Sequence, residues 1–172
     1  MNTMVQFDIR TSMGIQKHKT PLRNRVLLFI TKSADAGAIW IFIGLCMLGI
    51  SHLRSSGILF LEVLIITAIV NNLVIKSLVM RKRPCDIFKH VPLLIKRPCG
   101  SSFPSGHTAV AFACAVTLCV ICLPVGILAL IWAALIGFTR VYFFVHFLTD
   151  VLCGAISGII LSTLSIWLLS ML

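Results

Sequence analysis

The sequence predicts an all-α fold, a polytopic transmembrane helical bundle of about five spanning helices with one N-terminal amphipathic helix at the membrane interface. Hydrophobic residues make up 59% of the 172 residues, and the mean hydropathy is +1.05, whereas a soluble domain is only about half apolar. The apolar residues also gather in runs close to the roughly 20 residues that a helix needs to cross the hydrocarbon. Strands are disfavoured, because an open sheet edge leaves backbone groups unsatisfied in lipid. The length predicts a single domain, residues 1–172.

Two segments precede the first long apolar run. Residues 1–20 are polar, and we expect a partly disordered tail there. In residues 22–33 apolar side chains recur at helical spacing on one face, and basic side chains lie elsewhere. This pattern is typical of an amphipathic helix in the membrane interface, although it fits an extension of the first spanning helix equally well. The apolar face consists of Leu22, Val26, Phe29 and Ile30.

Five later segments have nearly the length and composition of spanning helices. They are Ala36–Leu53, Gly57–Val79, Phe103–Leu123, Val125–Phe144 and Val151–Leu172. Short turns follow the first and the third of these segments, which predicts two pairs of antiparallel neighbours. The longest connection, residues 81–102, is too polar to span and holds three prolines. A loop of this length in a compact domain is usually functional.

The order of these helices predicts that three polar stretches meet on one side of the membrane. The second helix ends at the long loop, and the third helix begins there. The third helix crosses the membrane and the fourth returns, so the turn after the fourth helix lies on the same side as the loop. Residues that are far apart in the sequence are therefore expected to share one active face.

The first polar stretch pairs two cations at the end of the second helix. Lys76 and Arg83 are seven residues apart, which is two helical turns, so both fall on one face. Pro84 then stops the helix. Taken alone, such cations are most often snorkelling anchors at the membrane surface.

The second polar stretch begins the third helix with Pro104, Ser105, Gly106 and His107. Proline suits the first turn of a helix, and glycine lets a ligand approach the backbone closely. Free amide groups and the helix dipole form an anion site at a helix start. Alone, this stretch is also compatible with an ordinary helix start that carries an interfacial histidine.

The third polar stretch lies at the turn after the fourth helix. His146 and Asp150 are four residues apart, so the carboxylate is within reach of the imidazole. A carboxylate on one ring nitrogen fixes the tautomer and leaves the other nitrogen free to attack. Arg140 offers a fork of donors that suits phosphate oxygens. An Arg–Asp ion pair at the membrane surface is the simpler interpretation of this stretch by itself.

Together, the three stretches resemble the tripartite signature of the type 2 phosphatidic acid phosphatase family, over roughly residues 76–150. The resemblance implies that His146 attacks phosphorus to form a phosphohistidine and that Asp150 orients it. It implies that His107 protonates the leaving oxygen and then activates water. It also implies a set of groups that bind the phosphoryl oxygens: Lys76, Arg83, Ser105, Gly106 and Arg140.

These residues predict an enzyme that needs no metal and no other cofactor. Phosphoryl transfer depends mostly on positioning and on stabilising charge on the equatorial oxygens, and three cations with a helix N-terminus supply both. The expected partners are the bilayer and a lipid phosphate substrate: phosphatidic acid, phosphatidylglycerol phosphate or an isoprenoid diphosphate such as undecaprenyl diphosphate. A transporter or channel is the rival function, because intramembrane charge also lines such paths. The polar groups gather at one face, which favours the enzyme.

The net charge of +10 predicts topology rather than nucleic-acid binding, because the bases lie at the ends of apolar runs. Arg54 is the one base expected on the opposite face. Eleven bases outside the three motif cations are expected on the active face: Arg10, Lys17, Lys19, Arg23, Arg25, Lys32, Arg81, Lys82, Lys89, Lys96 and Arg97. Since short-loop Lys and Arg normally stay inside, we expect the active face to be cytoplasmic. The bases at residues 81–83 and 96–97 would also attract an anionic lipid headgroup.

Overall fold

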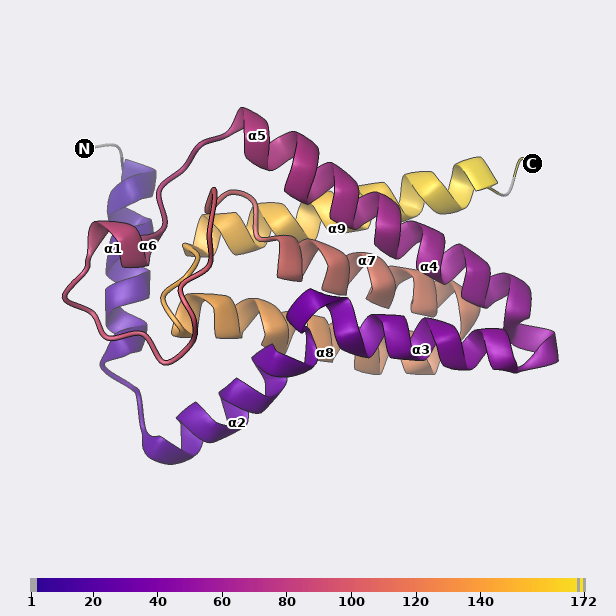
Figure 1. Ribbon diagram of the computed structural model, residues 1–172, viewed down its shortest axis with the longest axis horizontal. Helices are drawn as coiled ribbons and strands as arrows, with labels where there is room; N and C mark the ends of the chain where they lie inside the picture. The colour runs from indigo at the N-terminus through magenta and orange to yellow at the C-terminus, as the bar shows by residue number, and fades with distance from the viewer. Residues whose placement is uncertain (1–2, 170, 172) are drawn as a thin grey trace.

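The protein is an all-helical bundle in the computed structural model, which describes residues 3–169 and 171 (Figure 1). The fold class is as the sequence predicts. In chain order the elements are α1 (Thr3–Gln16), α2 (Pro21–Ser33), the 3-10 helix η1 (Asp35–Gly37), α3 (Ala38–Gly49), the 3-10 helix η2 (Ser51–Leu53), α4 (Arg54–Ile69), the π-helix η3 (Val70–Ile75), α5 (Lys76–Leu78), α6 (Pro84–Ile87), α7 (Gly106–Ile121), α8 (Leu123–Tyr142) and α9 (Leu148–Leu169).

Helix α7 lies at the centre of the bundle and packs against α4, α8 and α9. Helix α3 pairs with α4, while α1 and α2 pack on α8. Helix α1, α6 and the loop around α6 gather at one end of the bundle, and the end of α9 lies at the other (Figure 1). The three polar stretches therefore meet at the end of the molecule that also carries α1.

By length and composition, three helical stretches are able to cross a membrane: Ser51–Leu78, Leu123–Tyr142 and Leu148–Leu169. A fourth span is formed if α2 and the segment Asp35–Gly49 are counted as one, although they are bent by 48°. The bend coincides with left-handed backbone at Ala36 (φ 51°) and Gly37 (φ 75°). The prediction of five separate spans was therefore wrong in detail, because α3 has only 12 residues and α7 only 16.

The prediction for residues 1–20 was also wrong, because residues 3–16 form helix α1 rather than a disordered tail. Asp8 and Ser12 are buried on the face of α1 that contacts the bundle. The Gln16 side-chain amide donates to the backbone oxygen of Tyr142 at 3.1 Å, which ties the end of α1 to α8. Met13 and Ile15 also pack against apolar core clusters. These apolar contacts are too few for hydrophobic periodicity to have revealed the helix.

The predicted amphipathic segment, residues 22–33, is helical as α2. Pro21 occupies the first turn, and the Thr20 hydroxyl accepts a hydrogen bond from the Arg23 amide, which caps the helix. Leu22 is 73% exposed and Phe29 is 69% exposed, as expected for side chains that meet lipid. A second face carries Thr31 into the core of the bundle.

Two glycines let α9 approach α7 closely. A Cβ atom at Gly154 would lie 2.6 Å from the Ser105 carbonyl oxygen, and one at Gly158 would clash with the backbone of Ala109. Small residues allow this kind of backbone contact in membrane proteins. The contact holds the start of α7 beside the start of α9, where the Ser105 amide donates to the Asp150 carbonyl at 3.0 Å.

Candidate active site

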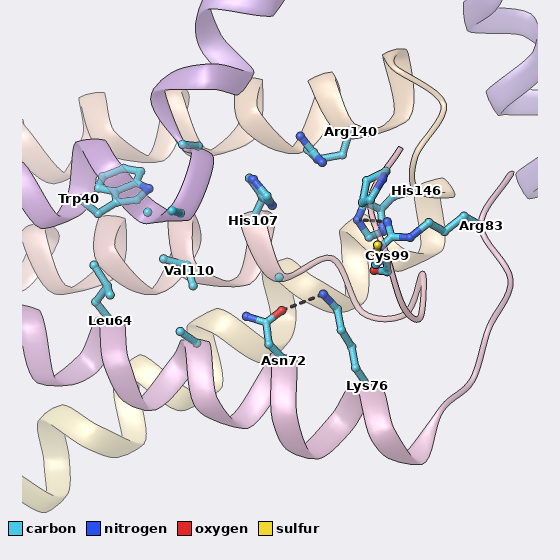
Figure 2. Close-up of a pocket in the computed structure, with 16 residues that line it drawn as sticks. Trp40, Leu64, Asn72, Lys76, Arg83, Cys99, His107, Val110, Arg140 and His146 are labelled. Atoms are coloured by element: carbon cyan, nitrogen blue, oxygen red, sulfur yellow. Dashed lines mark hydrogen bonds between the residues drawn. The ribbon is translucent and has the colours of Figure 1, made fainter. Parts of the chain in front are cut away.

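The motif residues surround one cavity of about 310 Å³. Its lining includes both motif histidines and the three motif cations, and Figure 2 shows them grouped around one part of the space. Trp40, Leu64 and Val110 line the other part, so the cavity has a charged end and an apolar end (Figure 2). The charged groups come from α5, the loop before α6, α7, α8 and the turn before α9.

His146 is buried, and its hydrogen bonds define one tautomer. Its Nδ1 lies 2.6 Å from the backbone oxygen of Ser102, which only accepts. Its Nε2 lies 3.1 Å from Arg83 Nη1, which only donates. The proton is therefore on Nδ1, and the Nε2 lone pair accepts the hydrogen bond from Arg83. This is the tautomer that a nucleophilic imidazole requires, and the Arg83 contact must give way before Nε2 attacks.

Burial lowers the pKa of His146 below the ordinary value for histidine, and the nearby cations Arg83 and Arg140 add to the effect. The nearby Asp150 carboxylate opposes it. A histidine with a lowered pKa remains neutral at more acidic pH than a free imidazole does. His146 is therefore unprotonated at neutral pH.

Asp150 is fully buried and lies outside the cavity lining, behind His146. Its Oδ2 is 3.8 Å from His146 Nδ1, so the closer acceptor for the imidazole proton is the Ser102 carbonyl. The same oxygen accepts from the Ser102 hydroxyl at 2.5 Å and from the Phe147 amide at 2.8 Å. Asp150 thus holds the loops on both sides of His146 and also places negative charge near the ring.

Arg83 is buried, and all of its nitrogens donate hydrogen bonds. Besides His146, the acceptors are the backbone oxygens of Cys99, Gly100, Ser101 and Val145, at 3.0–3.2 Å. Arg83 therefore organises the loop 81–102 around the nucleophile. Arg83 Nη1 lies 3.1 Å from His146 Nε2, so it is close enough to donate to an oxygen of a phosphoryl group bound to that nitrogen.

Arg140 and Lys76 reach the cavity from opposite sides (Figure 2). Arg140 Nη1 donates to the Thr31 hydroxyl at 2.6 Å, while its buried Nε has no hydrogen-bond partner among the residues that the structure describes. This nitrogen is therefore a hydrogen-bond donor that an oxygen of a bound phosphate could use. Lys76 Nζ donates to Asn72 Oδ1 at 2.7 Å.

His107, at the first turn of α7, lies across the cavity from His146 (Figure 2). Its Nε2 is 3.3 Å from Asp35 Oδ1, in the bend between α2 and α3. A carboxylate only accepts, so this nitrogen carries a proton in that contact. Asp35 therefore provides His107 with an acceptor for its Nε2 proton.

Two of the predicted phosphate-binding residues, Ser105 and Gly106, lie at the start of α7, and only Gly106 lines the cavity. Gly106 lines the cavity beside Asn72, and an added Cβ would collide with the Asn72 side chain. Ser105 is buried outside the cavity lining, and its hydroxyl accepts from Thr108 Oγ1 at 2.9 Å. The structure thus brings Gly106 to the cavity and places Ser105 behind it.

Sequence reasoning missed three residues of the site: Asp35, Asn72 and Ser102. Asn72 precedes Lys76 by one helical turn, a spacing that could have indicated their contact. The π-helical segment Val70–Ile75 carries Asn72, and such segments are frequent at functional sites. Asp35 and Ser102 have no comparable signal, because they reach the histidines only through tertiary structure.

The chain resembles proteins of a known family. Residues 56–172 match the model of the PAP2 superfamily. The chain is 30% identical over 164 residues to an undecaprenyl-diphosphatase of Sulfolobus acidocaldarius, covering 94% of this chain and 78% of that protein. It is 27% identical over 151 residues to the undecaprenyl-diphosphatase BcrC of Bacillus subtilis, covering 88% of this chain and 77% of that protein.

Two solved structures share the architecture. One is a transmembrane PAP2 type phosphatidylglycerolphosphate phosphatase from Bacillus subtilis, with a TM-score of 0.81, 27% identity, and coverage of 100% of this chain and 89% of that one. The other is LpxE from Aquifex aeolicus, with a TM-score of 0.77, 27% identity and 92% coverage of both chains. The histidine- and cation-lined cavity, the membrane-spanning helices and the family match lead to one conclusion: the chain belongs to the PAP2 superfamily and is a multi-pass membrane phosphatase that hydrolyses lipid phosphates without a metal.

Proposed function

We propose that this enzyme removes the terminal phosphate from a lipid phosphate or diphosphate through a phosphohistidine on His146. The observation that carries the proposal is the cavity itself, with a nucleophilic nitrogen on one side, His107 on the other, and three cations around them. Lys76, Arg83 and Arg140 would hold the phosphoryl oxygens, and the Gly106 amide at the helix start would add a donor. Ser105 would support that helix start from behind.

In the first step, the lone pair of His146 Nε2 attacks phosphorus and forms the P–N bond. The bond from phosphorus to the leaving oxygen breaks, its electron pair stays on that oxygen, and His107 supplies the proton. The imidazole of the phosphohistidine then carries a positive charge, which Asp150 stabilises from the Nδ1 side. Asp35 supports the protonated form of His107 before transfer.

In the second step, a water molecule attacks phosphorus while His107 takes its proton. The P–N bond breaks and its electron pair returns to Nε2, which regenerates neutral His146. Inorganic phosphate leaves, carrying the oxygen of the water. General acid–base catalysis of this kind typically contributes about 10²–10⁴-fold to a rate.

The apolar end of the cavity supports a substrate with a hydrocarbon chain. Trp40, Leu64 and Val110 lie at this end, beside α3, α4 and α7 (Figure 2). The candidate substrates are phosphatidic acid, phosphatidylglycerol phosphate and isoprenoid diphosphates. Undecaprenyl diphosphate is the first to test, because two relatives are named for that activity.

A neighbouring cavity of about 590 Å³ favours a diphosphate among these substrates. It shares His107 and Arg140 with the first cavity and adds the bases Lys32, Lys96 and Arg97. A phosphate on the leaving-group side would lie near this basic wall.

Phosphate release by the purified protein from a panel of the three lipids tests the assignment. A preference for a diphosphate should disappear in the variant Lys96→Ala/Arg97→Ala. No release from any lipid would favour the transporter or channel alternative.

We expect activity to persist in chelator and to be inhibited by vanadate, which mimics five-coordinate phosphorus. The physical reason is that no carboxylate among the described residues lines the cavity, whereas Mg²⁺ prefers oxygen ligands. The measurement is phosphate release after dialysis against EDTA, with and without added Mg²⁺. Activity that is lost in EDTA and restored by Mg²⁺ would contradict the expectation.

We further expect the active face to be cytoplasmic, because the bases outside the motifs lie mostly on that side. Arg81 is held between two acids and contributes less to this bias than its charge suggests. An alkaline-phosphatase fusion after Leu172 should be active, and a fluorescent-protein fusion there should be dark. A fusion inserted after Lys89, in the active-face loop, should give the opposite pattern. Reversed signals at both sites would place the active face outside.

A further inference from the structure

The N-terminal helix supplies a buried acid to the network behind the nucleophile. Asp8, on α1, is 1% exposed. Its Oδ2 lies 2.7 Å from Arg81 Nη2, and Arg81 Nη1 lies 2.6 Å from Asp150 Oδ1. Arg81 thus connects Asp8 to Asp150, which stands next to His146.

The remaining contacts of Asp8 and Arg81 fix this arrangement. Thr149 donates to Asp8 twice, from its amide at 3.0 Å and from its hydroxyl at 2.5 Å. The Arg81 guanidinium lies 4.5 Å from the centre of the Phe147 ring, a cation–π contact. Phe147 and Thr149 lie between His146 and Asp150 in the sequence. The contacts of Asp8 and Arg81 with these two residues therefore fix the turn that carries the nucleophile. The residues that match the family model begin at 56, so α1 lies outside the matched range.

The charges in this network suggest a catalytic purpose. Asp8, Arg81 and Asp150 together carry one net negative charge, directly behind the ring that becomes cationic when phosphorylated. Without Asp8, Arg81 would neutralise Asp150, and the site would lose that negative charge. Asp8 and Asp150 are buried and the Arg81 side chain is 25% exposed, so water screens these charges less than it screens charges on the surface.

We propose that Asp8 and Arg81 are positioning residues of the phosphatase reaction, which fix Asp150 and keep a net negative charge behind His146 during phosphoryl transfer. This inference rests on the proposed phosphohistidine mechanism. Asp8 forms an ion pair with Arg81 and so offsets the positive charge of Arg81. The negative charge of Asp150 then remains to stabilise the imidazolium. Arg81 acts by holding the two carboxylates together and aligning the turn.

The test compares three variants of the full-length protein in single-turnover experiments with a radiolabelled substrate that has a good leaving group. Asp8→Asn removes the charge and keeps the shape. Asp8→Asn/Arg81→Met also removes the opposing charge, which restores the net negative charge behind the ring. Asp86→Asn is the control, because Asp86 makes an exposed ion pair with Arg97 at 3.6 Å in the same loop.

For Asp8→Asn we expect the rate of phosphoenzyme formation to fall about tenfold, a typical coupling for contacting charges. The burst amplitude, which counts folded active sites, should stay near that of the wild type, as should KM. The double variant should recover part of the lost rate, and Asp86→Asn should match the wild type.

Three outcomes would overturn the inference: a reduced burst amplitude at an unchanged rate, an unchanged rate at full amplitude, or a double variant as fast as the wild type, which would show that Arg81 has no positioning role. The first would make Asp8 a purely structural anchor for α1. Absence of any phosphoenzyme in the wild type would instead contradict the proposed function, so the two failures are distinguishable.

Discussion

Replacement of His146 by alanine is expected to abolish turnover while the protein still inserts and folds. The nucleophilic Nε2 is lost. Among the described residues, no other imidazole lies between Arg83 and the Ser102 carbonyl. Removal of a nucleophile of this kind costs roughly 10⁴-fold or more in kcat. Stability should fall only modestly, because Asp150 keeps its contacts with Ser102, Phe147 and Arg81.

The measurement is phosphate release together with trapping of a radiolabelled phosphoenzyme in denatured protein. The wild type should give a label that is stable to alkali and labile to acid, as expected of phosphohistidine, and His146→Ala should give none. His90→Ala is the matched control, because His90 lies in the 81–102 loop and does not line the cavity. Near-normal activity or a persistent label in His146→Ala would remove His146 from the nucleophile role.

Replacement of His107 by alanine is expected to reduce hydrolysis of a lipid substrate by about 10²–10⁴-fold, the usual contribution of a general acid–base group. The effect should depend on the leaving group. An alkoxide needs a proton as the P–O bond breaks, whereas an activated leaving group does not. His107→Ala should therefore still form some phosphoenzyme from an activated phosphate, but should hydrolyse it slowly, because water activation also needs this histidine.

Single-turnover experiments separate the two steps. With an activated substrate, we expect the phosphoenzyme to accumulate in His107→Ala and to decay within seconds in the wild type. Asp35→Asn is an informative companion variant, since Asp35 contacts His107 Nε2 at 3.3 Å. It should weaken catalysis less than His107→Ala does. Equal losses with activated and natural substrates would contradict the general-acid role.

The fold class and the residues proposed for the site could be predicted from the sequence alone, because both predictions depend on local patterns. Apolar runs predict membrane helices, since the bilayer is the solvent and its thickness sets their length. The prediction that Lys76 and Arg83 share one helical face was wrong, because α5 ends at Leu78 and Arg83 lies at the N-cap of α6, which Pro84 begins. His146 likewise precedes α9, so loop structure rather than one continuous helix brings it near Asp150. The structure places the two motif histidines and the three motif cations around one cavity.

Local patterns failed where tertiary contacts decide the outcome. Asp8 lies 141 residues before Thr149 in the chain, yet both belong to one buried hydrogen-bonded group. Few apolar side chains of α1 face the bundle, so its sequence was interpreted as a disordered tail. The sequence pattern also left open whether residues 22–33 extend the first span, and the bend at Ala36 and Gly37 separates the two helices.

The sequence by itself determined the solvent in which this protein folds, the order of its helices and the chemical groups that its site requires. Only the tertiary structure decided which partners those groups have. It placed Ser102 on the Nδ1 of His146, Asp35 on His107, and Asp8 with Arg81 behind Asp150. The physical reason is that helix formation and membrane burial follow from neighbouring residues. The electrostatic environment of a buried imidazole depends instead on charges brought from distant parts of the chain.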